Sequence, residues 1–194
     1  MKTRILIKSI WLLVLVSLLG FASAANPLPR AWAEAGPGTN SPTQHWSNFQ
    51  FHYTAGTTLT PQRSLSVWEY GGAGCLSVSD NGVYSAGLHL PQGARIDHLY
   101  LAFYDTAPEN GTGSIVRFNN TGSSGWVVYV ASNGNGGYGT SISPLAGEVV
   151  DNSTYSYALQ WQGQASAGTA LRVCGIKVYY RVPLEAVYLP ILTR

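Results

Sequence analysis

Aromatic side chains are the residues of this chain whose types best suit binding chemistry. The 194-residue sequence holds six Trp, twelve Tyr and five Phe residues, whereas only 10% of its residues are charged. Rings on an exposed face or in loops can stack on sugar rings, with help from Asn, Asp and Gln, but in an interior the same rings fill the core. Trp161 shares its predicted strand face with Tyr157 and Leu159, so we expect it in the core. The remaining candidate ligand-binding rings are Trp68, Tyr70, Trp126 and Tyr138.

Catalytic motifs are not evident in the sequence. Gly134, Gly136 and Gly139 match the spacing of a dinucleotide-binding motif, but the following segment, with Pro144, does not suit the helix that this motif needs. We therefore predict a hairpin loop at 134–139. The serines form no Gly-x-Ser-x-Gly elbow. We predict no catalytic residues and no enzyme activity, while a hydrolase whose triad is assembled from distant residues stays as the less favoured alternative.

No metal or cofactor site is predicted. The four histidines show no ligand spacing, and neither cysteine has a second cysteine nearby. Asp80 and Asp151 begin Asx-type turn sequences that could supply oxygen ligands to calcium. The turns explain the same residues without an ion, so calcium remains the alternative.

The first 24 residues have the layout of a secretory signal peptide. A basic start precedes an apolar run at 10–19 that is too short to span a bilayer, and Ala22 and Ala24 supply the small side chains that a cleavage site needs. Three of the eleven basic residues lie in this leader, so cleavage leaves eight basic and nine acidic residues, a net charge of −1. This balance does not favour nucleic acid as a partner, and no membrane span is expected after cleavage.

Cys75 and Cys174 are the two cysteines of a chain that we expect outside the cytoplasm. An oxidising compartment permits a disulfide between them, although two buried thiols remain possible from the sequence. A bond would require Cα atoms about 4.4–6.8 Å apart.

Short segments of alternating apolar residues, separated by Gly, Asn and Pro turns, predict an all-β fold, a single antiparallel β-sandwich. We place a flexible linker at 25–45, the sandwich at 46–182 and an apolar tail at 183–194. The segment 99–104 is apolar or aromatic on both faces and is expected to be central. Gly175 is expected at a bulge. The predicted strands cover 46–53, 64–70, 76–79, 84–90, 99–104, 114–118, 126–131, 155–162 and 170–182.

Three segments carry a resemblance to uncharacterised secreted bacterial proteins with a jelly-roll-like β-sandwich. They are Leu88 to Ile96 with the following Phe103-Tyr104-Asp105, Asp151 to Tyr157, and Leu171 to Tyr180. The likeness covers about residues 80–182 and implies a fold and a compartment without any catalytic residue. The tail 187–192 also resembles a short terminus of exported proteins of some filamentous bacteria.

Together these patterns predict a secreted or cell-surface, non-enzymatic module with a structural or adhesive role, whose partners would be cell-surface polysaccharide or a second copy of the chain. The alternative is an extracellular carbohydrate-binding module.

Overall fold

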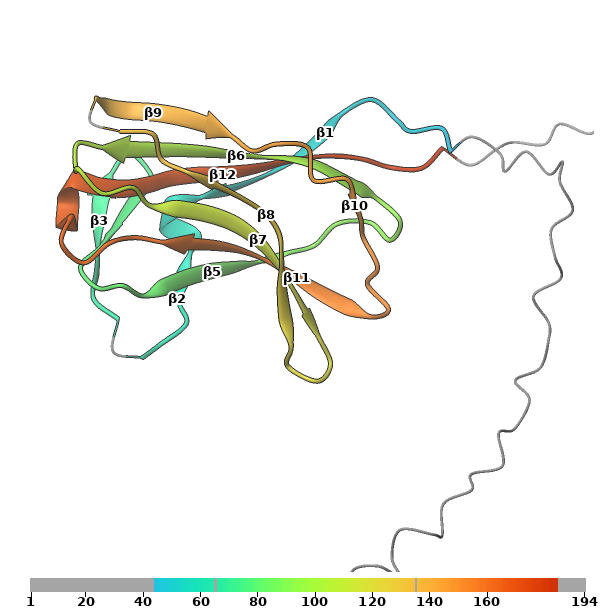
Figure 1. The fold of residues 1–194 in the computed structure, drawn as a ribbon, viewed down its shortest axis with the longest axis horizontal. Coiled ribbons are helices and arrows are strands. Elements are labelled where there is room, and N and C mark those ends of the chain that lie inside the picture. The colour runs from blue at the N-terminus through green and yellow to red at the C-terminus, as the bar shows by residue number, and fades with distance from the viewer. Residues whose placement is uncertain (1–43, 65, 135, 185–194) are drawn as a thin grey trace, which may run out of the picture. The chain divides into compact units, whose positions relative to one another are not determined.

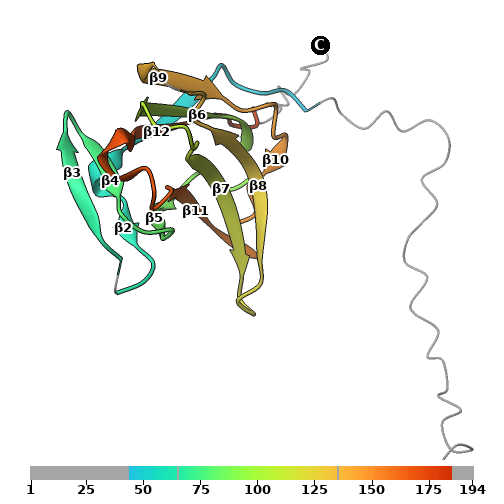
Figure 2. The ribbon, with the colours of Figure 1, turned by 60° about the vertical axis from the view of Figure 1, so that its left-hand side comes forward.

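Two antiparallel sheets pack face to face in the computed structural model, which describes residues 44–64, 66–134 and 136–184 (Figures 1 and 2). The predicted all-β, jelly-roll-like sandwich is confirmed. The seven-stranded sheet contains β1 (Gln50–Ala55), β3 (Trp68–Gly72), β4 (Cys75–Val78), β6 (Arg95–Asp105), β9 (Gly137–Ile142), β10 (Glu148–Val149) and β12 (Leu171–Arg181). The five-stranded sheet contains β2 (Thr60–Pro61), β5 (Val83–Leu88), β7 (Thr112–Asn119), β8 (Ser124–Ala131) and β11 (Tyr155–Gln162).

The longest strands, β6 and β12, form the middle of the seven-stranded sheet and pair with each other. On one side of this pair, β12 pairs with β4 and β1 along different parts of its length. On the other side, β6 pairs with β9 and β10 in the same manner. The predicted central position of 99–104 is therefore confirmed. Short 3-10 turns, η1 (Gly56–Thr58) and η2 (Gly168–Ala170), lead out of β1 and into β12.

The core lies between the two sheets and takes one phase of each long strand. Trp161 of β11 is fully buried, as predicted, and two glycines leave room for side chains of the core here, Gly111 for the indole and Gly163 for Val78. A Cβ atom on Gly111 would approach its ring to 2.1 Å, and one on Gly163 would meet Val78 at 2.1 Å. The other large, fully buried side chains include Tyr84, Leu76, Ile96, Leu99, Leu101, Ile115, Leu159, Leu171, Ile176, Val78 and Val150.

The glycine-rich stretch differs from its prediction. Gly139 lies inside β9, and β9 pairs with β6 whereas β8 pairs with β7, so the loop connects two sheets and is not a hairpin. Residue 139 is a glycine for a reason other than a turn. It lies opposite Phe103, whose ring would come within 2.7 Å of a Cβ atom at residue 139. Glycine here leaves room for a core side chain within a strand.

The predicted signal peptide (1–24), the linker up to residue 43 and the tail from residue 185 lie outside the described residues. Near the ends of the described chain, Trp46 and Pro183 form an isolated antiparallel bridge. Within the described chain, no helix has the length and apolar character needed to cross a membrane.

Candidate functional site

The outward-facing side of the seven-stranded sheet carries a group of aromatic rings, which we call the aromatic face. Residues directly opposite each other in neighbouring antiparallel strands share a face of the sheet. Tyr53 lies opposite Lys177, which lies opposite Tyr100, and Phe51 lies opposite Tyr179. At the other end of β6, Tyr104 lies opposite Tyr138. The aromatic face consists of Phe49, Phe51, Tyr53, Tyr100, Tyr104, Tyr138 and Tyr179.

Much of this aromatic surface is open to solvent. Phe51 exposes 63% of its surface and Tyr138 exposes 68%, while Phe49 and Tyr53 also expose more than half. Monomeric soluble proteins seldom leave contiguous apolar patches of this kind without a partner or ligand. The predicted strand at 46–53 therefore exposes its aromatic side chains. The covered side of this strand is the alternate set of residues, in which His52 is partly covered and Thr54 is buried.

Cations lie among the rings of the aromatic face. The Nζ atom of Lys177 is 5.2 Å from the ring centroid of Phe51, 5.5 Å from that of Tyr100 and 5.9 Å from that of Tyr179. Distances of this size permit cation–π attraction, which holds the ammonium group near the centre of the face.

Arginines stand at the two ends of the aromatic face. Arg172 lies over Tyr104, and its guanidinium donates to the carbonyl oxygens of Thr169 and Gly71. Arg181 lies over Phe49 at the other end. These contacts place one cation beside the rings at each end of the face.

A buried carboxylate orients the arginines at the Phe49 end. Asp97 is fully buried and accepts from Nε of Arg95 and Nε of Arg181, each at 2.8 Å. Both guanidinium groups also lie over aromatic rings, Arg95 over Trp46 and Arg181 over Phe49. Removing one partner of such a buried ion pair leaves the charge of the other partner uncompensated. The cluster therefore helps to hold the two arginines in place at this end of the aromatic face.

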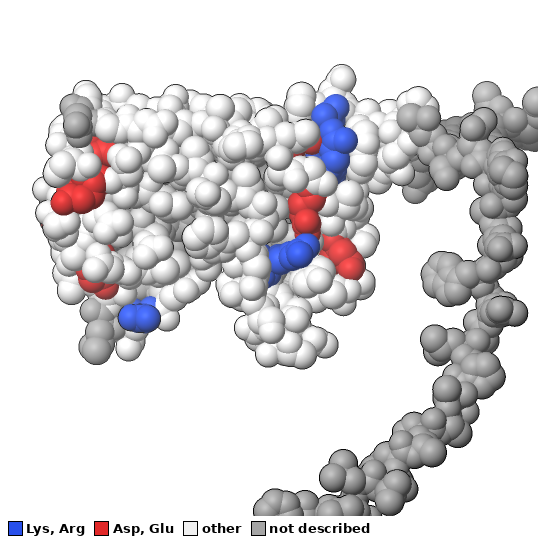
Figure 3. Space-filling view, in the orientation of Figure 1, with Lys and Arg blue, Asp and Glu red and all other residues white. Residues whose placement is uncertain are grey.

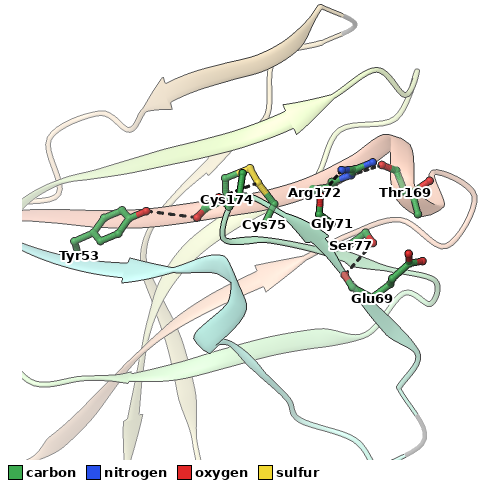
Figure 4. The surroundings of a disulfide bond; sticks show 9 residues. Tyr53, Glu69, Gly71, Cys75, Ser77, Thr169, Arg172 and Cys174 are labelled. Carbon is green, nitrogen blue, oxygen red and sulfur yellow. Dashed lines mark hydrogen bonds between the residues drawn. A yellow bond between two sulfur atoms is a disulfide. The ribbon is translucent and has the colours of Figure 1, made fainter.

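The disulfide lies close to the aromatic face and is confirmed between Cys75 and Cys174 (Figure 4). The Cα atoms are 3.8 Å apart, closer than the range that we expected, and the two cysteines lie on neighbouring strands next to the paired residues Leu76 and Val173. Cys174 is the extra residue of a bulge in β12, just before Gly175 as predicted. The ring of Tyr53 lies over Gly175, and its hydroxyl donates to the carbonyl oxygen of Cys174 at 3.5 Å. The missing side chain at Gly175 therefore lets this ring lie on the sheet.

The four rings predicted as ligand-binding candidates fall in three separate places. Tyr138 belongs to the aromatic face, 5.0 Å from the ring of Tyr104. Trp68 and Tyr70 form a contact pair on β3, opposite the buried Val78 and Leu76, and so lie at the rim of the core side of the sheet. Trp126 lies on β8 of the other sheet.

Trp126 forms a smaller exposed aromatic pair of its own. A bulge at Val127 leaves both Trp126 and Tyr129 exposed, with ring centroids 5.2 Å apart. The two rings border an open pocket together with Pro144. This pair is well exposed but carries no cation over its rings among the cation–π contacts of the described residues.

The candidate rings predicted from the sequence include one residue of the aromatic face, Tyr138, and omit the rest of it. The signal lies in 99–104, where Tyr100, Ala102 and Tyr104 form a second apolar phase, but from the sequence this phase predicts only a central strand. The alternation of Phe49, Phe51 and Tyr53 predicts a strand but does not tell which of its faces is covered. Lys177 had no distinguishing feature in the sequence, because its contacts come from strands far apart in the chain.

A second cluster of titratable groups lies near β10. Nη1 of Arg117 donates to Oε1 of Glu148 at 2.7 Å, and the hydroxyl of Tyr157 also donates to Oε1 of Glu148. Burial raises the pKa of Tyr157, and the negative charge of Glu148 raises it further by a smaller amount. Since Glu148 is engaged by both partners, the cluster has the character of a structural ion pair linking β7 to β10.

The predicted calcium candidates form Asx turns. Oδ1 of Asp80 accepts from the backbone N–H of Gly82, and Oδ1 of Asp151 accepts from that of Ser153, each at 3.1 Å. Across the residues the structure describes, no group of three or more His, Cys, Asp or Glu side chains could hold a metal ion.

Comparison with known proteins gave matches to solved structures alone, since no family model and no curated protein matches the chain. One similar structure is the CBM36-1 domain of a xylanase from the hindgut metagenome of Trinervitermes trinervoides, with 9% identity and a TM-score of 0.45 over 66% of this chain and 96% of that one. A second is the family 35 carbohydrate binding module from Clostridium thermocellum, with 14% identity and a TM-score of 0.40 over 66% and 97%.

A third similar structure is the exo-β-1,3-galactanase of Phanerochaete chrysosporium, with 16% identity, a TM-score of 0.42 and 67% of this chain matched to 29% of the enzyme. The chain therefore spans less than a third of that protein. Function lives in sites and not in folds. The surface of this chain is therefore what bears on its function.

Proposed function

We propose that this protein is a non-enzymatic, extracellular module that binds polysaccharide through the aromatic face of its seven-stranded sheet. The observation that carries the proposal is the exposure of Phe49, Phe51, Tyr53 and Tyr138, each more than half accessible, on one face. The disulfide and the predicted export signal support a location outside the cytoplasm.

The shape of the aromatic face suits a polymer better than a small molecule. Small ligands bind in concave pockets that bury most of their surface. The aromatic face instead extends over β1, β12, β6 and β9, and its rows of side chains repeat about every 6.6–6.8 Å along each strand because alternate residues share a face. A chain of sugar rings can contact several such rows at once.

The composition of the face also suits sugars. The C–H groups of a pyranose ring pack on aromatic rings, and its hydroxyls need hydrogen-bond partners. Tyr hydroxyls, the ammonium of Lys177 and the side chain of Thr140 offer such partners between the rings. Ile142, which lies opposite Tyr100, adds one exposed aliphatic side chain to these aromatic and polar groups.

A panel of immobilised plant, fungal and bacterial polysaccharides tests the proposal. The wild-type protein is expected to bind at least one polymer, and Phe51→Ala and Tyr138→Ala are each expected to weaken that binding about tenfold or more, since exposed aromatic anchors carry a large share of binding energy. The matched control is Trp126→Ala, which removes an equally exposed ring from the other sheet.

Two results would contradict the proposal. One is binding that Trp126→Ala abolishes and Phe51→Ala leaves unchanged, which would move the site to β8. The other is a concentration-dependent dimer in sedimentation that Phe51→Ala disrupts, without binding to any polymer, which would support an adhesive role through self-association.

A further inference from the structure

The charge on the aromatic face indicates which polysaccharides it would select. Four of the six basic residues in the described chain lie on this face or at its end. They are Arg95, Arg172, Lys177 and Arg181.

Carboxylates on the same side are fewer. Asp97 is fully buried, and its two oxygens are taken by Arg95 and Arg181. Glu69 lies at the edge of the sheet on β3, opposite Ser77, which in turn lies opposite Arg172. Four cations therefore stand against two carboxylates, and one of these two is inaccessible to a ligand.

Lys177 is the cation that a ligand on the rings would meet. Its ammonium group lies between Phe51, Tyr100 and Tyr179, and none of the salt bridges between described residues involves it. Within the described chain its partners are π-faces, which leave its N–H donors free for a stronger acceptor. An anionic oxygen is such an acceptor, and its hydrogen bond to an ammonium is about twice as strong as one between neutral groups.

From this arrangement we infer that the ligand is an acidic polysaccharide, one whose sugar rings carry a carboxylate or sulfate group. The sugar ring stacks on Phe51 and Tyr100 while its oxyanion accepts hydrogen bonds from Lys177. The inference rests on the proposed function and adds the charge of the polymer to it. Carboxylate and sulfate share this chemistry, so the experiment compares both.

The test measures affinity for pairs of polymers with the same backbone. Polygalacturonate is compared with fully methyl-esterified polygalacturonate, and dextran sulfate is compared with dextran. The wild-type protein is expected to bind one acidic member of these pairs about tenfold or more tightly than its neutral counterpart, and to lose affinity as ionic strength rises.

Variants identify the cation that is responsible. Lys177→Gln is expected to lower affinity for the acidic polymer about tenfold, while Lys177→Arg, which keeps the charge, is expected to retain most of it. The control is Arg63→Gln, which removes the same charge from an exposed loop away from the face. The rings around Lys177 are the exposed Phe51 and the partly exposed Tyr100 and Tyr179, and an unchanged melting temperature will show that the Lys177→Gln variant folds.

Failure of the inference and failure of the proposed function give different results. If the protein binds the neutral and acidic polymers equally, and Phe51→Ala weakens both while Lys177→Gln weakens neither, the aromatic face binds sugar but does not select charge. If Arg63→Gln has the same effect as Lys177→Gln, the preference is a property of net charge and the inference is wrong. If no polymer binds, or if Phe51→Ala has no effect, the proposed function itself is wrong.

Discussion

Strands β1 and β11 have the same alternation of aromatic and polar residues, yet they present their aromatic phases to opposite environments. In β11 the phase of Tyr157 and Trp161 is buried, and Trp161 is fully inaccessible. In β1 the phase of Phe51 and Tyr53 faces solvent. The seven-stranded sheet covers the inner face of β11 (Figure 2), whereas the exposure of Phe51 and Tyr53 puts the aromatic phase of β1 on the outer side of the sandwich. A period of two therefore identifies a strand but does not tell which face is covered.

The largest expected difference is between one ring from each strand. Trp161→Ala should lower the free energy of unfolding by about 3–5 kcal/mol because it leaves a cavity in the core. Phe51→Ala should change it by no more than about 0.5 kcal/mol, as is usual for exposed positions. Denaturant unfolding of both variants measures the contrast, and equal losses would mean that something covers β1 in solution.

The disulfide links β12, a central strand of the aromatic face, to the neighbouring strand β4. It closes a segment with a sequence separation of 99 residues. Replacing both cysteines with serine should lower the free energy of unfolding by about 2–4 kcal/mol, because the unfolded chain gains freedom. Thermal unfolding with and without reductant checks this, and a wild-type melting temperature indifferent to reductant would contradict it.

Two glycines give a matched test of the buried and exposed faces. Gly111→Ala would place a Cβ atom 2.1 Å from the Trp161 ring in the core, and should cost about 1–3 kcal/mol of stability through overpacking. Gly175→Ala would place one 2.4 Å from the Tyr53 hydroxyl, but that exposed side chain can rotate away. We therefore expect a smaller loss at 175 than at 111, together with weaker polysaccharide binding. A larger loss at 175, measured by denaturant unfolding, would show that Tyr53 is held rigidly.

The smallest expected effect concerns the turn that leads into β11. Hydrogen bonds from the side chain of Ser153, then from Thr154, lower the pKa of Asp151 from 3.8 to about 2. A carboxyl group with a lowered folded-state pKa stabilises the protein above its unfolded value, and this contribution is lost as the pH falls from about 4 to about 2. An NMR titration of Asp151 should give the low pKa and Ser153→Ala should raise it. An unperturbed titration of Asp151 in the wild-type protein would refute the turn geometry.

The sequence predicted the fold better than it predicted the candidate site. Turn residues and the alternation in β11 and β12 were sufficient for the sandwich, since both signals are local. The candidate rings are aromatic residues that the sequence does not assign to the core, and they include Tyr138 of the aromatic face but neither Phe51 nor the neighbouring Lys177. Exposure depends on the partner sheet and on strand pairing at long range, which a single local pattern does not contain.

The amino-acid sequence by itself determined the strand periodicity, the all-β class, the sparse charge seen as scattered groups in Figure 3, and the two cysteines available for pairing. The tertiary structure decided which aromatic phase became core and which became surface. It also brought Lys177 beside Phe51 and Tyr100, residues of three strands that are far apart in the chain. The physical reason is that apolar side chains on either face of a strand are stabilised by burial. Which face is buried therefore depends on where the other sheet packs.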